Sequence, residues 1–219
     1  MIPETEEDTA MSEPITVPMY AMHTEYIRQT EHIFPEHLMP ERMKKAARFR
    51  FERDRLLCIG AGMLMLRALG IPDESVLNYG PYGKPYAPGY PEFSLSHSGD
   101  WVIIAVAPDT VGADLEKPDS AHLSIADSVF TPAELDWMKA DPVSRFFRLW
   151  TLKESVMKAT GLGMDLEPAS FDVMPFTRSE PVLLDGRSWY AASGRLEDYT
   201  FSVCAACPVT PLLHIIGSQ

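Results

Sequence analysis

The sequence predicts an α+β protein, and two observations support this fold class. Each half of the chain contains one long helical segment, at about residues 40–69 and 144–160. Each half also contains short runs rich in β-branched and aromatic residues, which are typical of strands. Because a helix and an antiparallel sheet bury their apolar faces against one another, we expect each half to pack its long helix on a small antiparallel sheet.

The first half, residues 14–108, is expected to hold a strand, the long helix, a loop and two further strands. In order, these fall at residues 15–22, 40–69, 78–91, 93–95 and 101–107. Gly70 and Pro72 end the helix, because glycine closes helices readily and proline cannot continue them. The loop follows from its density of Pro and Gly, which leaves room only for short extended pieces. A Ser-His-Ser-Gly turn separates the last two strands.

The second half, residues 109–219, repeats this plan. The expected strands are residues 111–116, 170–173, 182–184, 188–192 and 199–206, and the expected helices are residues 123–130, a helix from Pro132, and residues 144–160. Thr131 suits the N-cap of the helix at Pro132, because its hydroxyl can accept a free backbone N–H. Gly161 suits the left-handed residue that ends the last helix.

Composition places the chain among globular proteins. It has 219 residues, of which 46% are hydrophobic and 23% charged. No apolar run approaches the ~20 residues that span a bilayer, so no membrane association is expected. Residues 1–13 are acidic, unlike a secretory signal, and we expect them to form a disordered tail. We therefore expect a cytoplasmic protein.

The charge of the chain is unevenly distributed. The net charge of −12 argues against nucleic-acid binding. Residues 42–55 nevertheless contain seven basic residues against two acidic ones, and the basic ones are Arg42, Lys44, Lys45, Arg48, Arg50, Arg53 and Arg55. This cluster is either a solvated helix face or a site for a polyanionic ligand or an acidic protein partner.

Two segments indicate a metal-bound phosphate site. On the strand at 111–116, Asp114 and Glu116 point to one face because strands have period two. On the helix at 144–160, Trp150, Glu154 and Lys158 form a stripe because residues four apart stack. If the segments meet, three carboxylates and one ammonium converge, which suits Mg²⁺ shared with substrate oxygens. Alternatively, the first motif is a solvated strand end, and Glu154 and Lys158 form an ion pair contributing roughly 0.2–0.5 kcal/mol.

Together these segments resemble the signature of the 4′-phosphopantetheinyl transferases, in the larger class that activates surfactin synthetase. The two motifs read G-x-D-x-E and W-x-x-K-E-S-x-x-K-x-x-G-x-G. Further matches are the G-K-P at residues 83–85, the F-S-L-S-H-S at residues 93–98, and Arg48-Phe49 with Asp54 downstream. Ser94 stands where the family usually has Asn. The resemblance covers roughly residues 40 to 207.

The resemblance implies two pseudo-duplicated lobes, residues 14–108 and 109–219, with the active site at their junction. It implies transfer of the phosphopantetheine arm of coenzyme A to a serine of an apo acyl or peptidyl carrier protein, with release of 3′,5′-ADP. Mg²⁺, with Mn²⁺ as an alternative, would be held by Asp114, Glu116 and Glu154. Glu154 is the candidate general base, and a water held by Glu116 is an equal alternative. Lys158 would contact the phosphate.

Further residues match positions that bind coenzyme A in the family. Lys84, Ser96 and His97 are candidates for contacts to phosphate or ribose, against the alternatives of a solvated loop lysine and a turn whose side chains cap the backbone. Arg42, Lys45 and Arg48 are candidates for binding the 3′-phosphate, because they lie along one expected helical face. This chain has Leu57 where the family usually has a phosphate-binding arginine, and Arg55 is a candidate replacement.

The carrier is expected to dock near the junction, with Arg145, Arg148 and residues 123–137 as candidates, on a monomeric enzyme. The residues leave two rival functions open. One is a non-catalytic carrier-binding homologue, which the retained carboxylates and Lys158 disfavour. The other is a Mg²⁺-dependent diphosphate hydrolase, which leaves the G-K-P and Ser-His-Ser segments unexplained.

Overall fold

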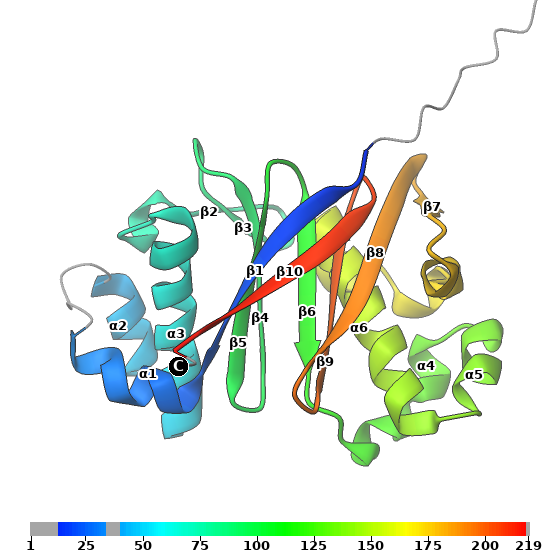
Figure 1. Ribbon diagram of the computed structural model, residues 1–219, viewed down its shortest axis with the longest axis horizontal. Coiled ribbons are helices and arrows are strands. Elements are labelled where there is room, and N and C mark those ends of the chain that lie inside the picture. Colours follow the sequence, from blue (N-terminus) through cyan, green and yellow to red (C-terminus); the bar gives the residue numbers. More distant parts are fainter. Residues whose placement is uncertain (1–12, 34–39, 218–219) are drawn as a thin grey trace, which may run out of the picture.

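The computed structural model describes residues 13–33 and 40–217, so all but Glu13 of the expected N-terminal tail lies outside the described residues. Strands fill the centre of the molecule, with helices α1–α3 on one side and α4–α6 on the other (Figure 1). The α+β class is confirmed. Within the described ranges, no helix is long and apolar enough to cross a membrane.

The helices lie in two groups along the chain. They are α1 (Thr24–Thr30), α2 (Pro40–Ala46), α3 (Glu52–Leu69), α4 (Ala126–Val129), α5 (Pro132–Met138) and α6 (Pro142–Thr160). The strands are β1 (Ile15–His23), β2 (Asn78–Tyr79), β3 (Pro85–Tyr86), β4 (Glu92–Ser98), β5 (Trp101–Ala107), β6 (Val111–Glu116), β7 (Val182–Leu184), β8 (Arg187–Leu196), β9 (Tyr199–Ala205) and β10 (Val209–Ile216).

The strands form two four-stranded sheets and one small hairpin. The first sheet has the order β10-β1-β5-β4, the second has the order β6-β9-β8-β7, and β2 pairs with β3. Strand β10 lies parallel to β1, with Ile15 opposite Val209, whereas the other pairs are antiparallel. The expectation of purely antiparallel sheets was therefore wrong for the first sheet. Pro211 interrupts the strand pattern of β10, and proline is tolerated there because β10 is an edge strand.

Three expected elements differ in the structure. The helix expected at 40–69 is divided, because α2 ends at Ala46 and α3 begins at Glu52. Arg48 consequently lies outside both helices, so the expected shared helical face does not exist. Residues 170–173 form no strand, and Ser170 is instead the last residue of a 3-10 turn at Pro168–Ser170. The helix expected at 123–130 is a 3-10 helix at Ser120–Ile125 followed by the short α4.

Three sequence-based helix ends are confirmed. Gly70 ends α3 in the left-handed conformation, with a φ of 72°. The Thr131 hydroxyl accepts from the Glu134 N–H while the Glu134 carboxylate accepts from the Thr131 N–H, which makes a capping box at α5. Gly161 ends α6 in the left-handed conformation, with a φ of 75°.

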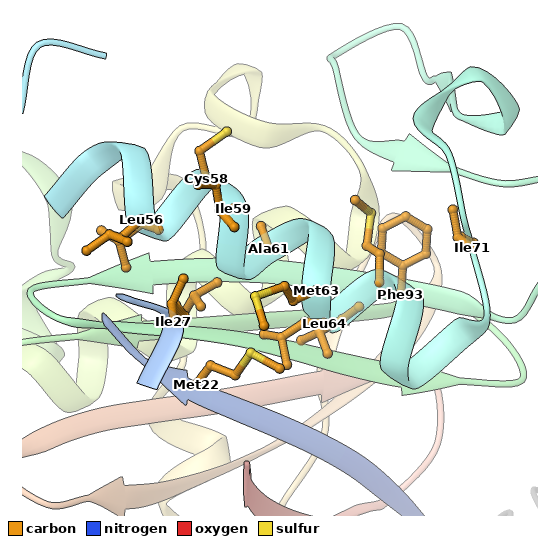
Figure 2. Close-up of a cluster of buried hydrophobic side chains, with 14 of the residues drawn as sticks. Met22, Ile27, Leu56, Cys58, Ile59, Ala61, Met63, Leu64, Ile71 and Phe93 are labelled. Carbon is orange, nitrogen blue, oxygen red and sulfur yellow. The ribbon is translucent and has the colours of Figure 1, made fainter. Parts of the chain in front are cut away.

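Three buried clusters hold the elements together. In the first cluster, α3 lies across the first sheet. The residues of this cluster include Ile27, Leu64 and Phe93 (Figure 2). In the second, α6 packs on the second sheet. The third lies between the sheets and combines residues of β1 and β5 with residues of β6 and β9, including Ile103 and Val203. This third cluster joins the halves, and beside it the edge strands β4 and β6 come together.

Candidate active site

The strand carrying the D-x-E motif touches the helix carrying the K-E-S motif at Gly112. A Cβ atom on Gly112 would lie closer than 3.0 Å to the carbonyl oxygen of Ser155 and to the backbone of Ala159. Backbone atoms cannot turn aside as a flexible side chain can, so only glycine allows this approach. The glycine of the motif thus brings Asp114 and Glu116 against the helix that carries Glu154 and Lys158.

Asp114 is at the centre of the site. Its side chain is almost fully buried, and its Oδ1 accepts from Lys158 Nζ at 2.6 Å and from Ser96 Oγ at 2.8 Å. Its Oδ2 is also buried but has no hydrogen-bond partner among the described residues. Lys158 therefore pairs with Asp114 and not with Glu154 as the surface ion-pair alternative required, since no Glu154–Lys158 pair occurs in the described residues.

The two glutamates lie in an environment that opposes their ionisation. Burial, together with the charge of Asp114, raises the pKa of Glu116 to about 7, although Ser98 donates a 2.8 Å hydrogen bond to it. Burial and then Asp114 also raise the pKa of Glu154. A cation at this site would favour the ionised form of both carboxylates, which burial and the charge of Asp114 otherwise disfavour.

The donor set fits a hard divalent cation. Within residues 13–33 and 40–217, no three His, Cys, Asp or Glu side chains form a ready-made metal cluster. However, Asp114 Oδ2 is an unpartnered buried carboxylate oxygen, and its charge acts on both neighbouring glutamates. Mg²⁺ usually takes one or two carboxylates from the protein and completes its shell with water and phosphate. The residues therefore fit a metal that binds jointly with a phosphate-containing substrate.

Ser96 and His97 lie within β4, so the expectation of a tight turn at these residues was wrong. Ser96 is buried and faces Asp114, whereas His97 points to the opposite side of the strand and is exposed. Partial burial of the His97 ring lowers the pKa of His97, and the positive charge of Lys158 lowers it further. The charge of Lys45 also lowers this pKa. His97 therefore lies within electrostatic range of a lysine from each half of the chain.

The basic segment is only partly available to a ligand. Arg42 is buried and forms an ion pair with the nearly buried Glu74. Arg55 donates two hydrogen bonds to Glu31, at 2.6 and 3.0 Å. These two arginines are already compensated.

Lys45 and Arg48 differ from those two arginines. Both are exposed, and neither side chain has an ion pair or hydrogen bond within the described part of the chain. Because Lys45 also acts on His97, the positive charge of Lys45 lies toward the site.

Lys84 connects the two motif-bearing elements. Its Nζ donates to the carbonyl oxygen of Val111 at 3.0 Å and to that of Ala159 at 3.4 Å. Burial lowers the pKa of Lys84. Lys84 is thus not a solvated loop lysine, because it ties the start of β6 to the end of α6.

A cavity opens beside these lysines. It has a volume of about 260 Å³, and both Lys84 and Lys158 line it. Phe93, Leu95 and Met157 contribute apolar walls. The cavity therefore combines an apolar interior with two cations, which suits a ligand with both apolar and anionic parts.

Two residues of the motifs have positions that sequence reasoning missed. Ser98 donates a hydrogen bond to Glu116. The sequence signal for this role was that Ser98 lies two residues after Ser96 on a strand, and therefore on the same face. Lys153 is fully buried and pairs with Glu134 at 2.9 Å, far from any role with a ligand. Only the three-dimensional structure distinguishes Lys153 from Lys158.

The expected docking residues lie on α6 beside Trp137. The Arg145 guanidinium lies 4.4 Å from the centre of the Trp137 ring and donates to its carbonyl oxygen at 2.6 Å. Arg148 is exposed and lies 5.8 Å from the same ring. Arg148 is therefore the more accessible of the two for a partner.

Similarity to known proteins extends over most of the chain. Residues 110–204 match the model of the 4′-phosphopantetheinyl transferase superfamily. A 4′-phosphopantetheinyl transferase of Bacillus subtilis is 32% identical over 184 residues, which are 77% of this chain and 82% of the relative. The transferase Sfp of Bacillus subtilis strain 168 is 31% identical over 81% of this chain and 86% of its own. The transferase Gsp of Aneurinibacillus migulanus is 38% identical over 49% of this chain and 47% of its own.

Proposed function

The chain belongs to the 4′-phosphopantetheinyl transferase superfamily, and we propose that it transfers the 4′-phosphopantetheine arm of coenzyme A to a serine of an apo acyl or peptidyl carrier protein. The released product is 3′,5′-ADP. The observation that carries this proposal is the environment of Asp114, where Lys158 binds one carboxylate oxygen and the other is buried and unpartnered. A pyrophosphate and a divalent cation together complete such a site.

Charge neutralisation is the first requirement of the reaction, because the attacked phosphate repels nucleophiles. Asp114, Glu116 and Glu154 would hold Mg²⁺, or Mn²⁺ in its place, and the bound ion would supply positive charge against the negative charge of the pyrophosphate. Lys158 lies beside Asp114 and can turn its ammonium from Oδ1 to a phosphate oxygen. The reaction then gains electrostatic stabilisation without moving either backbone element.

Proton removal from the carrier serine is the second requirement. The serine oxygen forms a bond to the β-phosphorus of coenzyme A, the bond from this phosphorus to the bridging oxygen breaks, and 3′,5′-ADP leaves with that oxygen. We assign the serine proton to Glu154, whose raised pKa makes it a better base than an ordinary glutamate. A water held by Glu116, with its pKa of about 7, is the alternative acceptor.

The 3′-phosphate of coenzyme A requires cations away from the metal. We assign it to Lys45 and Arg48, whose side chains have no ion pair or hydrogen bond within the described residues, with His97 in electrostatic range of Lys45. Arg42 was a candidate for the same role, but its use would require the phosphate to displace Glu74. The same argument applies to Arg55 and its bond to Glu31, so the cation set is smaller than the sequence indicates.

Incubation with coenzyme A, Mg²⁺ and an apo carrier protein tests the proposal. Mass spectrometry should show that the carrier gains the mass of the phosphopantetheine arm. We expect the enzyme to act as a monomer. Glu154→Gln should abolish the gain while its melting temperature stays near that of the wild type. Glu167→Gln, a change of an exposed carboxylate, is the matched control and should transfer normally.

Two other outcomes of this experiment correspond to the rival functions. Binding of the carrier without any mass gain would identify a non-catalytic carrier-binding protein. Cleavage of coenzyme A in the absence of carrier would identify a diphosphate hydrolase. Either outcome would overturn the proposal.

A further inference from the structure

Strands β4 and β6 face each other across the boundary between the two sheets, and serine hydroxyls fill the gap. Each strand is at the edge of its own sheet. Every second residue of β4 in this stretch is a serine, and each accepts the backbone N–H of the residue 19 positions later. The bonds run from Ala113 N to Ser94 at 2.9 Å, from Leu115 N to Ser96 at 3.3 Å, and from Lys117 N to Ser98 at 3.0 Å.

This serine ladder, Ser94, Ser96 and Ser98, replaces backbone pairing between the sheets. An edge strand with free N–H groups in a buried position would otherwise lose stability, because unpaired backbone donors are costly. Serine on alternate residues supplies acceptors at the repeat of the strand. The ladder therefore fixes the register of β6 against β4.

Two rungs of the ladder also hold carboxylates. Ser96 donates to Asp114 Oδ1 at 2.8 Å, and Ser98 donates to Glu116 Oε2 at 2.8 Å. As a donor, the Ser94 hydroxyl contacts the Ala113 carbonyl at 3.5 Å, and within the described residues it makes no hydrogen bond to a carboxylate. Ser94 thus lines the cavity beside Lys84 and Lys158 without holding a carboxylate, whereas Ser96 and Ser98 each hold one.

The hydroxyl of Ser96 has no remaining capacity for a phosphate. A hydroxyl has one donor proton and two acceptor lone pairs. The proton goes to Asp114, and the lone pairs accept from Leu115 N and from Lys158 Nζ at 3.1 Å. A phosphate oxygen needs a donor, so Ser96 contacts coenzyme A only by releasing Asp114.

We propose that Ser96 and Ser98 are positioning residues that orient the carboxylates of Asp114 and Glu116 for the divalent cation. Ser96 and Lys158 both occupy Oδ1 of Asp114, which leaves Oδ2 as the oxygen for the cation. Ser98 anchors Glu116 in the same way. This inference rests on the proposed function, since it assigns how that site holds its cation.

Single alanine variants at the three rungs test the inference, with Ser94→Ala as the matched control. Binding of Mn²⁺ in the presence of coenzyme A is measured from the electron paramagnetic resonance signal of the free ion. Ser96→Ala and Ser98→Ala should weaken Mn²⁺ binding about 10–100-fold, as loss of a hydrogen bond to a ligand usually does, whereas Ser94→Ala should change it less than about threefold. Equal losses in all three variants would overturn the inference, because the ladder would then act only through packing.

Calorimetric titration with coenzyme A in the absence of metal separates positioning from direct contact. Ser96→Ala should leave this affinity unchanged, and a weaker affinity with normal Mn²⁺ binding would make Ser96 a direct phosphate ligand and overturn the inference. Ser98→Thr keeps the hydroxyl and should bind Mn²⁺ like the wild type, even if an alanine variant folds poorly. A loss as large as that of Ser98→Ala would also overturn it.

Failure of the proposed function has a separate signature. It would appear as absence of carrier modification by the wild-type protein, whatever the Mn²⁺ affinities of the variants.

Discussion

Replacement of Glu116 by glutamine should stabilise the metal-free protein at alkaline pH. The pKa of Glu116 is raised in the folded protein from 4.5 to about 7. Between these pH values the folded state binds a proton that the unfolded state has lost. Stability therefore falls as the pH rises through this window, which is the reverse of the behaviour of a salt-bridged carboxylate.

The size of the effect follows from the shift. One pKa unit corresponds to about 1.4 kcal/mol, so the full shift corresponds to about 3 kcal/mol of unfolding free energy above pH 7. Glu116 is partly exposed, and solvent screening reduces this to about 1–2 kcal/mol. For a chain of this length, that difference is a change of about 2–8 °C in melting temperature.

Thermal unfolding of the wild type and Glu116→Gln at pH 5 and pH 8, with a chelator present, measures this directly. The variant should melt higher than the wild type at pH 8 and at nearly the same temperature at pH 5. Adding Mg²⁺ with coenzyme A at pH 8 should raise the melting temperature of the wild type more than that of the variant, because only the wild type keeps the Glu116 carboxylate as a cation ligand. An equal difference between the proteins at both pH values would show that Glu116 titrates normally and would refute the reasoning.

Three further predictions concern the strand, its contact with α6 and the basic segment. Asp114→Ala should lower kcat at saturating Mg²⁺ at least about 100-fold with the fold retained, and retention of more than about a tenth of wild-type kcat would remove Asp114 from the metal site. Gly112→Ala should lower both the melting temperature and the transfer rate, because the new Cβ atom meets the backbone of α6. Gly80→Ala is the control and should change neither, because the nearest atom to its new Cβ would lie at 3.7 Å. Wild-type enzyme should prefer coenzyme A over 3′-dephospho-coenzyme A in the ratio of KM values, and Lys45→Ala and Arg48→Ala should each reduce that preference. A wild-type ratio near one would assign the two cations to the acidic carrier instead.

Local patterns predicted most of the elements, because they depend on neighbours in sequence. The strand at Val111–Glu116 and the helix ending at Thr160 were expected within two residues of where they occur. The break between α2 and α3 was not expected, since residues 47–51 contain neither Pro nor Gly. Strand β10 was missed because its stability comes from a partner almost 200 residues away, and no local signal marks such a pairing.

The same limit applies to the site. Period two on the strand grouped Asp114 with Glu116, and both accept hydrogen bonds from serines of the neighbouring strand β4. The four-residue spacing on the helix grouped Glu154 with Lys158, and Lys158 reaches Asp114. Neither rule states which partner a charge selects, so Lys158 was assigned an alternative partner on its own helix and is found on Asp114. Arg42 likewise has the spacing of a ligand-binding residue but is paired with Glu74.

The two lysines of the α6 motif show why one helix needs both. They are five residues apart, which places them about 140° apart around the helix axis. Lys153 faces the interior, where it pairs with Glu134 and donates to the carbonyl oxygens of Pro168 at 2.8 Å and Phe171 at 2.6 Å. A buried charge is costly unless all of its donors are satisfied, so this network permits little rotation of the helix. With the rotation fixed on one side by Lys153 and the distance to β6 fixed on the other by Gly112, Lys158 lies on the face of α6 that meets β6, where its ammonium reaches Asp114.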